Sequence, residues 1–254
     1  MIRSFLAGAA GLAALVLAPT TLLAQEPAPR RDDPERVYDL DPLIDLPLLG
    51  LGLATTSAAF LEVPPPACIA AGSCTPPEDM PGIDRRVLGE YSPGAHGAAN
   101  AIVLTLALGP PVWSALETRD PSAWFADSVV HGESILLTQG LTQIVKFAVR
   151  RPAPLVYDAS VPLADRESRD AARSFWSGHT ATAFSAATTH AVTYWLRNPR
   201  DPWRFTVLAA DMTAAAAVGL LKMEAGYHYP SDVAAGALVG TSIGVLVPML
   251  HRRF

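Results

Sequence analysis

Long apolar segments separated by short polar ones run through most of the chain. Ala98–Leu116 has nineteen residues without a charge, and Val233–Leu250 has eighteen. Three further mainly apolar segments lie between them: Trp124–Val149, Ala181–Leu196 and Trp203–Lys222. Segments of this length are typical of helices. Together with a shorter, glycine-broken segment at Leu46–Leu61, they predict an all-α fold, a bundle of about six helices.

The composition favours a bundle that is embedded in a membrane. Half of the residues are hydrophobic and 17% are charged, whereas soluble domains have about a quarter charged residues. Gly236, Gly240 and Gly244 recur at four-residue spacing, which suits close helix packing in a bilayer and also in a compact soluble bundle. The net charge of −5 argues against nucleic acid as a partner. The oligomeric state stays open.

Residues 1–24 are predicted to be a signal peptide or an N-terminal anchor. Arg3 precedes an apolar stretch from Phe5 to Pro19, and a candidate cleavage end follows at Leu22–Ala24. Leu22 is larger than the residue preferred three positions before a cut, so an uncleaved anchor is the alternative. In both cases the chain is exported or inserted.

Residues 25–96 are predicted to form an exported N-terminal region ahead of a helical domain at 97–254. The region contains the Leu46–Leu61 helix, which is short for a membrane span. Cys68 and Cys74, the two cysteines of the chain, lie six residues apart in a proline-bounded loop. In an oxidising compartment this arrangement favours a small disulfide loop.

A candidate anion site precedes the Ala181–Leu196 segment, at Ser177-Gly178-His179. Ser177 is predicted to cap a helix, Gly178 allows a ligand to approach the backbone closely, and the free N–H groups point outward. A bound anion would have His179 beside it as a proton donor. A capped helix with an incidental histidine is the alternative.

A candidate nucleophile lies further along the chain. His228 and Asp232 are four residues apart, so a helix that begins near Pro230 brings the carboxylate close to the imidazole. A carboxylate that fixes the tautomer of His228 leaves the other ring nitrogen free to attack.

Cations stand close to these residues in a distinctive way. The cluster Lys146-Phe-Ala-Val-Arg-Arg151-Pro152, with cations at helical spacing, lies at the end of the Trp124–Val149 segment. The chain has nineteen basic residues but only two lysines, Lys146 and Lys222, and both fall among the candidate residues. This pattern predicts a pocket in which fixed cations hold phosphate.

Other titratable groups of the apolar segments are predicted to be structural. His131 and Glu133 are expected to be internal hydrogen-bonding groups, and His96 a surface or capping residue. No cluster of Asp, His and Glu suggests metal ligands, so the sequence predicts no metal and no cofactor.

The three clusters resemble the motifs of the type 2 phosphatidic acid phosphatase / vanadium haloperoxidase superfamily, over roughly Gly97 to Leu250. Those motifs run K-x6-R-P, P-S-G-H and S-R-x5-H-x3-D. His179, His228 and Asp232 match them. In the second motif Trp176 replaces proline, and in the third Leu221-Lys222 replaces Ser-Arg. In the first motif Ala153 stands at the position of the arginine, and Arg151-Pro152 offers a shorter K-x4-R-P instead.

The residue types predict a metal-independent phosphomonoesterase that acts through a phosphohistidine. His228, oriented by Asp232, would attack phosphorus, and His179 would protonate the leaving oxygen and then activate water. The oxygens of the phosphate would be held by Lys146, Arg151, Lys222, Ser177 and the Gly178 N–H. The resemblance implies lipid phosphates or isoprenoid pyrophosphates as substrates.

Three alternatives stay open. A vanadium-dependent haloperoxidase would use the same pocket with vanadate as a cofactor on His228, whereas a phosphatase would have vanadate as an inhibitor. A catalytically weak or inactive member, favoured by Ala153 and Lys222, would have a binding or structural role. A soluble periplasmic acid phosphatase would share the chemistry and differ in location and substrate.

The order of the helices places all three clusters on one face of the bundle. The opposite face has two short loops, Glu117–Ser122 and Arg197–Arg204, flanked by four of the five tryptophans and rich in arginine. This pattern favours a bacterial inner-membrane protein with that face in the cytoplasm and the site toward the periplasm. The orientation requires that the Leu46–Leu61 helix does not span.

Overall fold

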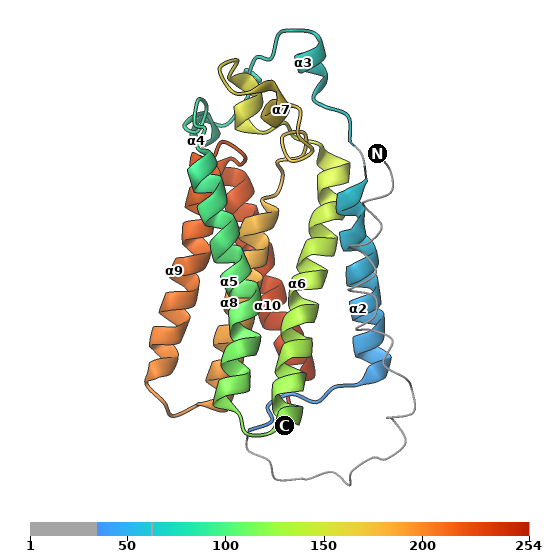
Figure 1. Ribbon diagram of the computed structural model, residues 1–254, viewed down its shortest axis with the longest axis vertical. Helices are drawn as coiled ribbons and strands as arrows, with labels where there is room; N and C mark the ends of the chain where they lie inside the picture. Colours follow the sequence, from blue (N-terminus) through green and yellow to red (C-terminus); the bar gives the residue numbers. More distant parts are fainter. Residues whose placement is uncertain (1–34, 62, 254) are drawn as a thin grey trace, which may run out of the picture. The chain divides into compact units, whose positions relative to one another are not determined.

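Six long helices form the body of the structure, a computed structural model that describes residues 35–61 and 63–253 (Figure 1). They are α2 (Pro42–Thr56), α5 (Pro93–Glu117), α6 (Pro121–Val149), α8 (Gly178–Arg197), α9 (Trp203–Glu224) and α10 (Pro230–His251). In the described part of the chain, β pairing is confined to one antiparallel bridge between Tyr38 and Arg252. The predicted all-α bundle is confirmed. The predicted leader, residues 1–24, lies outside the described residues.

Short helices occupy the connections between the long ones. They are η2 (Ser57–Phe60), α3 (Ala67–Ala70), α4 (Gly82–Arg85), η3 (Pro154–Tyr157) and α7 (Leu163–Arg166). Residues 35–96 and 97–253 lie in one compact unit. Cys68 and Cys74 form a disulfide in the connection that contains α3.

Local capping signals set where most of the long helices begin. The side chains of Asp41, Ser92, Asp120 and Ser177 each accept a backbone N–H at the start of α2, α5, α6 and α8. Proline follows in the first turn of α2, α5 and α6, where its missing N–H costs no helical hydrogen bond.

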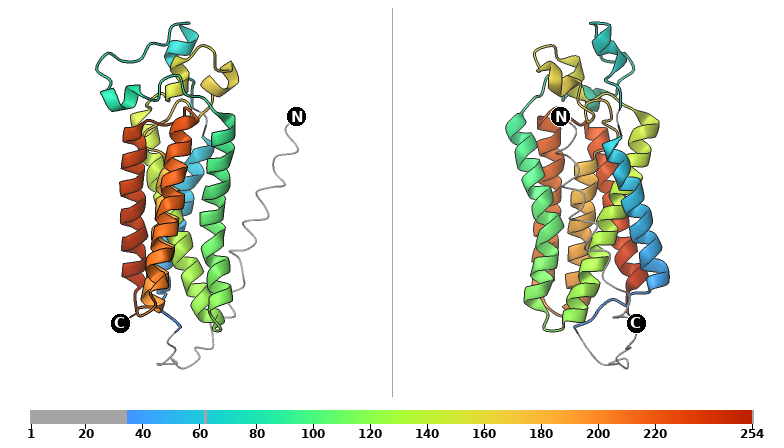
Figure 2. Two further views of the ribbon diagram at one scale, coloured as in Figure 1. Left: turned by 90° about the vertical axis from the view of Figure 1, so that its left-hand side faces the viewer. Right: turned by 45° about the vertical axis from the view of Figure 1, so that its right-hand side comes forward.

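The helix α8 is central, because it packs against α5, α6, α9 and α10 (Figure 2). The contact with α10 is close: a Cβ added to Gly240 would lie 2.1 Å from the Ala181 carbonyl oxygen. Gly236 and Gly244 also face the α8 backbone, at Ser177 and Ser185. The small-residue stripe of the sequence is therefore the surface on which α10 meets α8.

Within residues 35–61 and 63–253, four helices are long and apolar enough to cross a membrane: Pro42–Phe60, Pro93–Glu117, Trp203–Glu224 and Pro230–His251. Large apolar side chains on them face outward, among them Leu108, Leu220 and Leu238. The expectation that the first of these helices is too short is wrong. It begins at Pro42, earlier than Leu46, and has 19 residues. It therefore qualifies as a span by length and composition.

Candidate active site

The candidate residues converge at the end of the bundle where α6 ends and where α8 and α10 begin. The short helix α7 lies at the same end (Figure 1). A cavity of about 80 Å³ lies there. Its wall contains five of the predicted site residues: Lys146, Gly178, His179, Lys222 and His228. Five further residues complete it: His96, Gln139, Gln143, Asp170 and Tyr227. The helix order thus brings the three sequence clusters together.

The N-terminus of α8 forms one wall of the cavity. The Ser177 hydroxyl accepts the Thr180 N–H at 3.3 Å and the Thr180 hydroxyl at 2.8 Å. Ser177 is fully buried and acts as the predicted cap, but it does not line the cavity. Gly178 does, and a Cβ there would lie 3.1 Å from Thr142 and 3.6 Å from the Lys146 side chain. A larger residue would therefore press on Thr142 and touch the lysine side chain.

His228 lies between α9 and α10, with its Nδ1 3.7 Å from an oxygen of Asp232. The Ser174 hydroxyl donates to the same oxygen and lies 3.3 Å from Nδ1. Protonated Nδ1 can therefore donate to Ser174, which in turn donates to Asp232, and Nε2 is left with a free lone pair. Ser174, which the sequence analysis did not assign, acts with Asp232 to orient His228.

Arg151 lies behind Asp232 and outside the cavity wall. Its guanidinium donates to Asp232 at 2.6 Å, to Asp84 at 2.7 Å and to the Ser231 hydroxyl at 2.8 Å. Both carboxylates are almost fully buried. Arg151 therefore neutralises Asp232 at the start of α10 and Asp84 of α4. From the sequence, Arg151 was expected to bind phosphate.

The two lysines reach the cavity from different helices. Lys146 Nζ donates to the carbonyl of Arg173. Lys222 Nζ donates to Asn100 at 2.9 Å and lies 3.3 Å from Nδ1 of His96. Each ammonium thus has neutral partners that fix its position without cancelling its charge, which suits an anion site.

The charges around the cavity favour a neutral His228 and an ionised Asp170. Burial lowers the pKa of His228, and the bond with Asp232 opposes this shift without cancelling it. Desolvation would raise the pKa of Asp170, but the positive charge of Lys146, with smaller effects of His179 and His228, holds it below its usual value. A carboxylate therefore faces the cations where an anion would bind.

The prediction for His96 is wrong, because this residue lines the cavity. Its ring lies 4.7 Å from the ring of Tyr227 and 6.3 Å from that of His179, between centroids. His96 and Asp170 belong to none of the spaced clusters, so no sequence signal linked them to the site. Packing of α5 and of the loop after α7 places them there.

The model of the PAP2 superfamily matches residues 128–254, half of the chain. The chain belongs to the PAP2 superfamily. The matched residues include all of the predicted catalytic and phosphate-binding positions, whereas Asp45, Asp84 and His96 precede them.

Two curated relatives resemble parts of this PAP2 chain. A protein named "Probable diacylglycerol pyrophosphate phosphatase 1", from Schizosaccharomyces pombe, is 32% identical over 97 residues, 36% of this chain and 35% of the relative. A protein named "Lipid A 1-phosphatase", from Porphyromonas gingivalis, is 41% identical over 81 residues, 32% of this chain and 17% of the relative. The chain thus spans about a third or less of the length of these relatives.

A solved structure is similar in shape. It is described as the crystal structure of the first transmembrane PAP2 type phosphatidylglycerolphosphate phosphatase from Bacillus subtilis. The TM-score is 0.49 at 17% identity, over 81% of this chain and 94% of that one.

We expect Arg151→Gln to destabilise the PAP2 domain by about 3–5 kcal/mol, because it leaves the buried Asp84 and Asp232 without their cation. The measurement is chemical unfolding in detergent. The adjacent Arg150, whose guanidinium bonds only to the carbonyl of Phe147, is the control, and Arg150→Gln should change stability by less than about 0.5 kcal/mol. Equal losses in the two variants would contradict the role given to Arg151.

We expect Asp170→Asn to bind vanadate about ten-fold more tightly, a change of about 1.4 kcal/mol, because it removes a negative charge that faces the anion site. The measurement is a binding titration with orthovanadate. Asp158, a half-exposed acid earlier in the same connection that does not line the cavity, supplies the control variant Asp158→Asn, which should not change the affinity. Weaker binding by Asp170→Asn would show that this carboxylate instead serves to hold the cations in place.

Proposed function

We propose that this PAP2 protein is a metal-independent phosphatase that acts through a phosphohistidine on lipid phosphates. The observation that carries the proposal is that His179, His228 and both lysines of the chain line one small cavity. A nucleophile, an acid and fixed positive charge are the groups that phosphoryl transfer needs.

The proposed first step begins at Nε2 of neutral His228, which attacks phosphorus in line with the leaving oxygen. A nitrogen–phosphorus bond forms as the bond to that oxygen breaks, and His179 gives the oxygen a proton. In the second step His179 takes a proton from water, the water oxygen attacks phosphorus, and His228 leaves. Asp232 and Ser174 hold the Nδ1 proton throughout.

The negative charge that develops on phosphorus is balanced by fixed groups. Lys146 and Lys222 would contact the equatorial oxygens, and the Gly178 N–H would donate at the start of α8. The two ammonium groups supply the charge that a metal ion supplies in other phosphoryl-transfer enzymes. Arg151 and Ser177 would act indirectly, through Asp232 and through the position of α8.

The size of the cavity supports a lipid substrate. Pockets that enclose a whole small ligand measure about 300–1,000 Å³, so about 80 Å³ admits a phosphate group and leaves the remainder of the substrate outside. That remainder would lie along the apolar helices. Both curated relatives have the names of phosphatases that act on lipids, and an isoprenoid pyrophosphate fits the same description.

A weak or inactive phosphate-binding member is the second candidate, favoured by the missing arginines. Ala153 is fully buried in an apolar cluster with Leu155, Val156 and Ala171, so no cation enters the cavity from this position. Arg151, the nearest arginine, is paired with acids. The phosphate would therefore be held by fewer cations than the family motifs supply.

We expect His228→Asn to lower the rate by about 10⁴-fold or more, because the nucleophile is lost, and His179→Asn to lower it by about 10²–10⁴-fold. The assay follows phosphate release from an aryl phosphate and from phosphatidic acid, with a chelator present throughout. Vanadate should inhibit competitively, because its five-coordinate form resembles the transition state.

His190 provides the matched control for these histidine variants. It lies on α8 as His179 does, but pairs with Asp211 at 2.8 Å, away from the cavity, so His190→Asn should keep most of the activity. A rate that falls with chelator and returns with a divalent ion would contradict the fixed-cation mechanism. If the wild-type protein binds vanadate but shows no turnover, the inactive member is favoured. If it oxidises halide with vanadate bound, the haloperoxidase is favoured.

We propose further that the protein lies in the bacterial inner membrane with the cavity toward the periplasm. The disulfide at Cys68 and Cys74 lies in the connection at the cavity end, and disulfides persist in oxidising compartments. If α2 spans, this orientation requires residues before Pro42 to start in the cytoplasm. A leader that is translocated would instead place the residues before Pro42 in the periplasm. In that case the cavity can face the periplasm only if α2 does not cross the membrane.

Labelling of single cysteines tests this orientation. Glu167 at the end of α7 and Arg200 between α8 and α9 are both exposed, and the native cysteines are paired. We expect an impermeant maleimide to label Glu167→Cys in intact spheroplasts, and Arg200→Cys only after permeabilisation. The reverse pattern would invert the orientation, and labelling of both from outside would favour a soluble periplasmic protein.

A further inference from the structure

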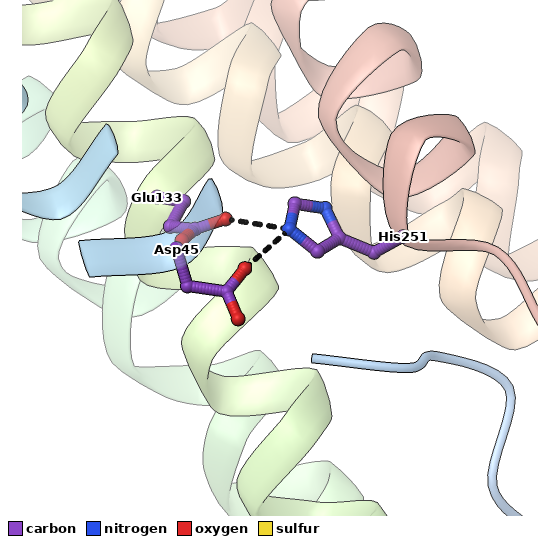
Figure 3. A group of neighbouring side chains, drawn as sticks. All are labelled: Asp45, Glu133 and His251. Carbon is purple, nitrogen blue, oxygen red and sulfur yellow. Dashed lines mark hydrogen bonds and ion pairs between the residues drawn. The ribbon is translucent and has the colours of Figure 1, made fainter. Parts of the chain in front are cut away.

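Three buried side chains meet far from the cavity, where α2, α6 and α10 come together. They are Asp45, Glu133 and His251, one from each helix (Figure 3). The Nε2 atom of His251 lies 2.7 Å from an oxygen of Asp45 and 3.2 Å from an oxygen of Glu133. One ligand atom from each residue fits within a span of 4.8 Å. The spacing of residues in the sequence does not predict this cluster, because the three residues are far apart in the chain.

The other ring nitrogen of His251 determines the state of this group. Nδ1 lies 2.8 Å from the carbonyl oxygen of Val247, which can only accept a hydrogen bond. Nδ1 therefore carries the proton, and in a neutral ring the lone pair of Nε2 points at two carboxylates. Lone pairs repel carboxylate oxygens, so a positive particle must lie among the three groups.

Glu133 shows that one proton would not satisfy the group. The residue is fully buried, and neither of its carboxylate oxygens has a hydrogen-bond partner of acceptable geometry. A single proton on Nε2 would satisfy Asp45 and leave Glu133 as a buried anion without a donor, which is costly. A divalent cation would balance both carboxylates and also use the imidazole lone pair.

The backbone around the three residues is held in place independently of them. The N–H of Asp39 donates to the carbonyl of His251 at 2.9 Å, and the N–H of Arg253 donates to Val37 at 3.0 Å. The start of α2 is thereby joined to the end of α10. On α6, a Cβ added to Gly140 would lie 2.0 Å from the Thr55 hydroxyl, so α2 and α6 approach closely as well.

We propose that Asp45, Glu133 and His251 form a structural site for a divalent transition-metal ion, zinc in the first instance. Two carboxylates and one imidazole suit zinc or manganese better than magnesium or calcium, which prefer oxygen ligands alone. The other ring N–H of a ligating histidine characteristically donates a hydrogen bond to a carbonyl or carboxylate, as Nδ1–H of His251 does to the carbonyl of Val247. Water would complete the coordination.

The two separations that involve His251 need only a small adjustment to hold zinc. Ligand atoms about 2.0–2.2 Å from a tetrahedral zinc lie roughly 3.3–3.5 Å apart. The separation of Nε2 from Glu133, 3.2 Å, is close to this value. The separation from Asp45, 2.7 Å, must widen by about 0.6 Å, which a rotation of the Asp45 side chain supplies.

The ion would fasten α2 to the rest of the bundle. It takes no part in the proposed phosphatase reaction, since none of its three ligands lines the cavity. The ligand His251 is the last residue of α10, whereas the cavity lies near the start of that helix. Chelation should therefore lower the melting temperature and leave the rate unchanged at temperatures at which the protein stays folded. This separation distinguishes the site from a catalytic metal.

The test measures zinc bound to the full chain in detergent, after removal of metals by a chelator, reloading with zinc and gel filtration. We expect about one zinc per chain in the wild type and less than a tenth of that in Glu133→Gln. Free zinc at about 100 times its dissociation constant should raise the melting temperature of the wild type by about 5 °C and leave that of Glu133→Gln unchanged.

Two controls decide where the zinc lies. Asp127→Asn removes another buried carboxylate of α6, one that pairs with Arg197, and should keep the zinc. His179→Asn removes a histidine of the cavity and should also keep it. Zinc that remains with Glu133→Gln, or is lost with His179→Asn, would place binding at the cavity histidines and overturn the proposal.

Absence of zinc and of manganese from the reloaded wild type would overturn the proposal as well, and would leave the three side chains sharing protons. If Glu133→Gln does not fold, Asp45→Asn takes its place. The rise in melting temperature with zinc, compared between the wild type and His179→Asn, also decides where zinc binds and needs neither Glu133→Gln nor Asp45→Asn. An equal rise supports the proposal, and loss of the rise in His179→Asn would place zinc in the cavity.

Discussion

The buried carboxylate of Asp232 is the group on which the arrangement of the site depends. It accepts hydrogen bonds from Arg151, Ser174 and the Tyr229 N–H, and its own carbonyl accepts the Ser177 N–H. One residue thus joins the start of α10, the N-terminus of α8 and the segment after α6. A fully buried anion is stable only with such donors. The donors that satisfy it therefore also hold His228 and the turn at the start of α8 in fixed positions relative to each other.

Local signals explain why much of this could be predicted from the sequence. The cap at Ser177 depends on residues within one turn, and the approach of Asp232 to His228 depends on a helix that begins at Pro230, as α10 does. Mainly apolar runs located the long helices for the same reason. Each signal acts within a few residues and needs no knowledge of the tertiary contacts.

The remaining features depend on contacts between distant segments. The length of α2 was underestimated because Asp45 was taken to precede the apolar segment. In the fold, Asp45 belongs to the first turn of α2 and is buried against His251. The helix therefore includes a residue that was expected to lie before it. Asp84 likewise reaches Arg151 across 67 residues. A charge that is paired after folding cannot be distinguished by spacing from one that marks a polar boundary.

The substitution of lysine for arginine at Lys222 shows how such distant contacts adapt a motif. Arginine has a planar fork that orients itself on phosphate, whereas an ammonium on a flexible stem must be positioned by other groups. Asn100 and His96, both on α5, hold Lys222 Nζ from the side. They make the lysine a fixed charge at the cavity wall, although they do not supply the second N–H donor that an arginine would offer to phosphate. The proposed phosphate pocket thus depends on α5, outside the family's motifs, to place one of its two lysine charges.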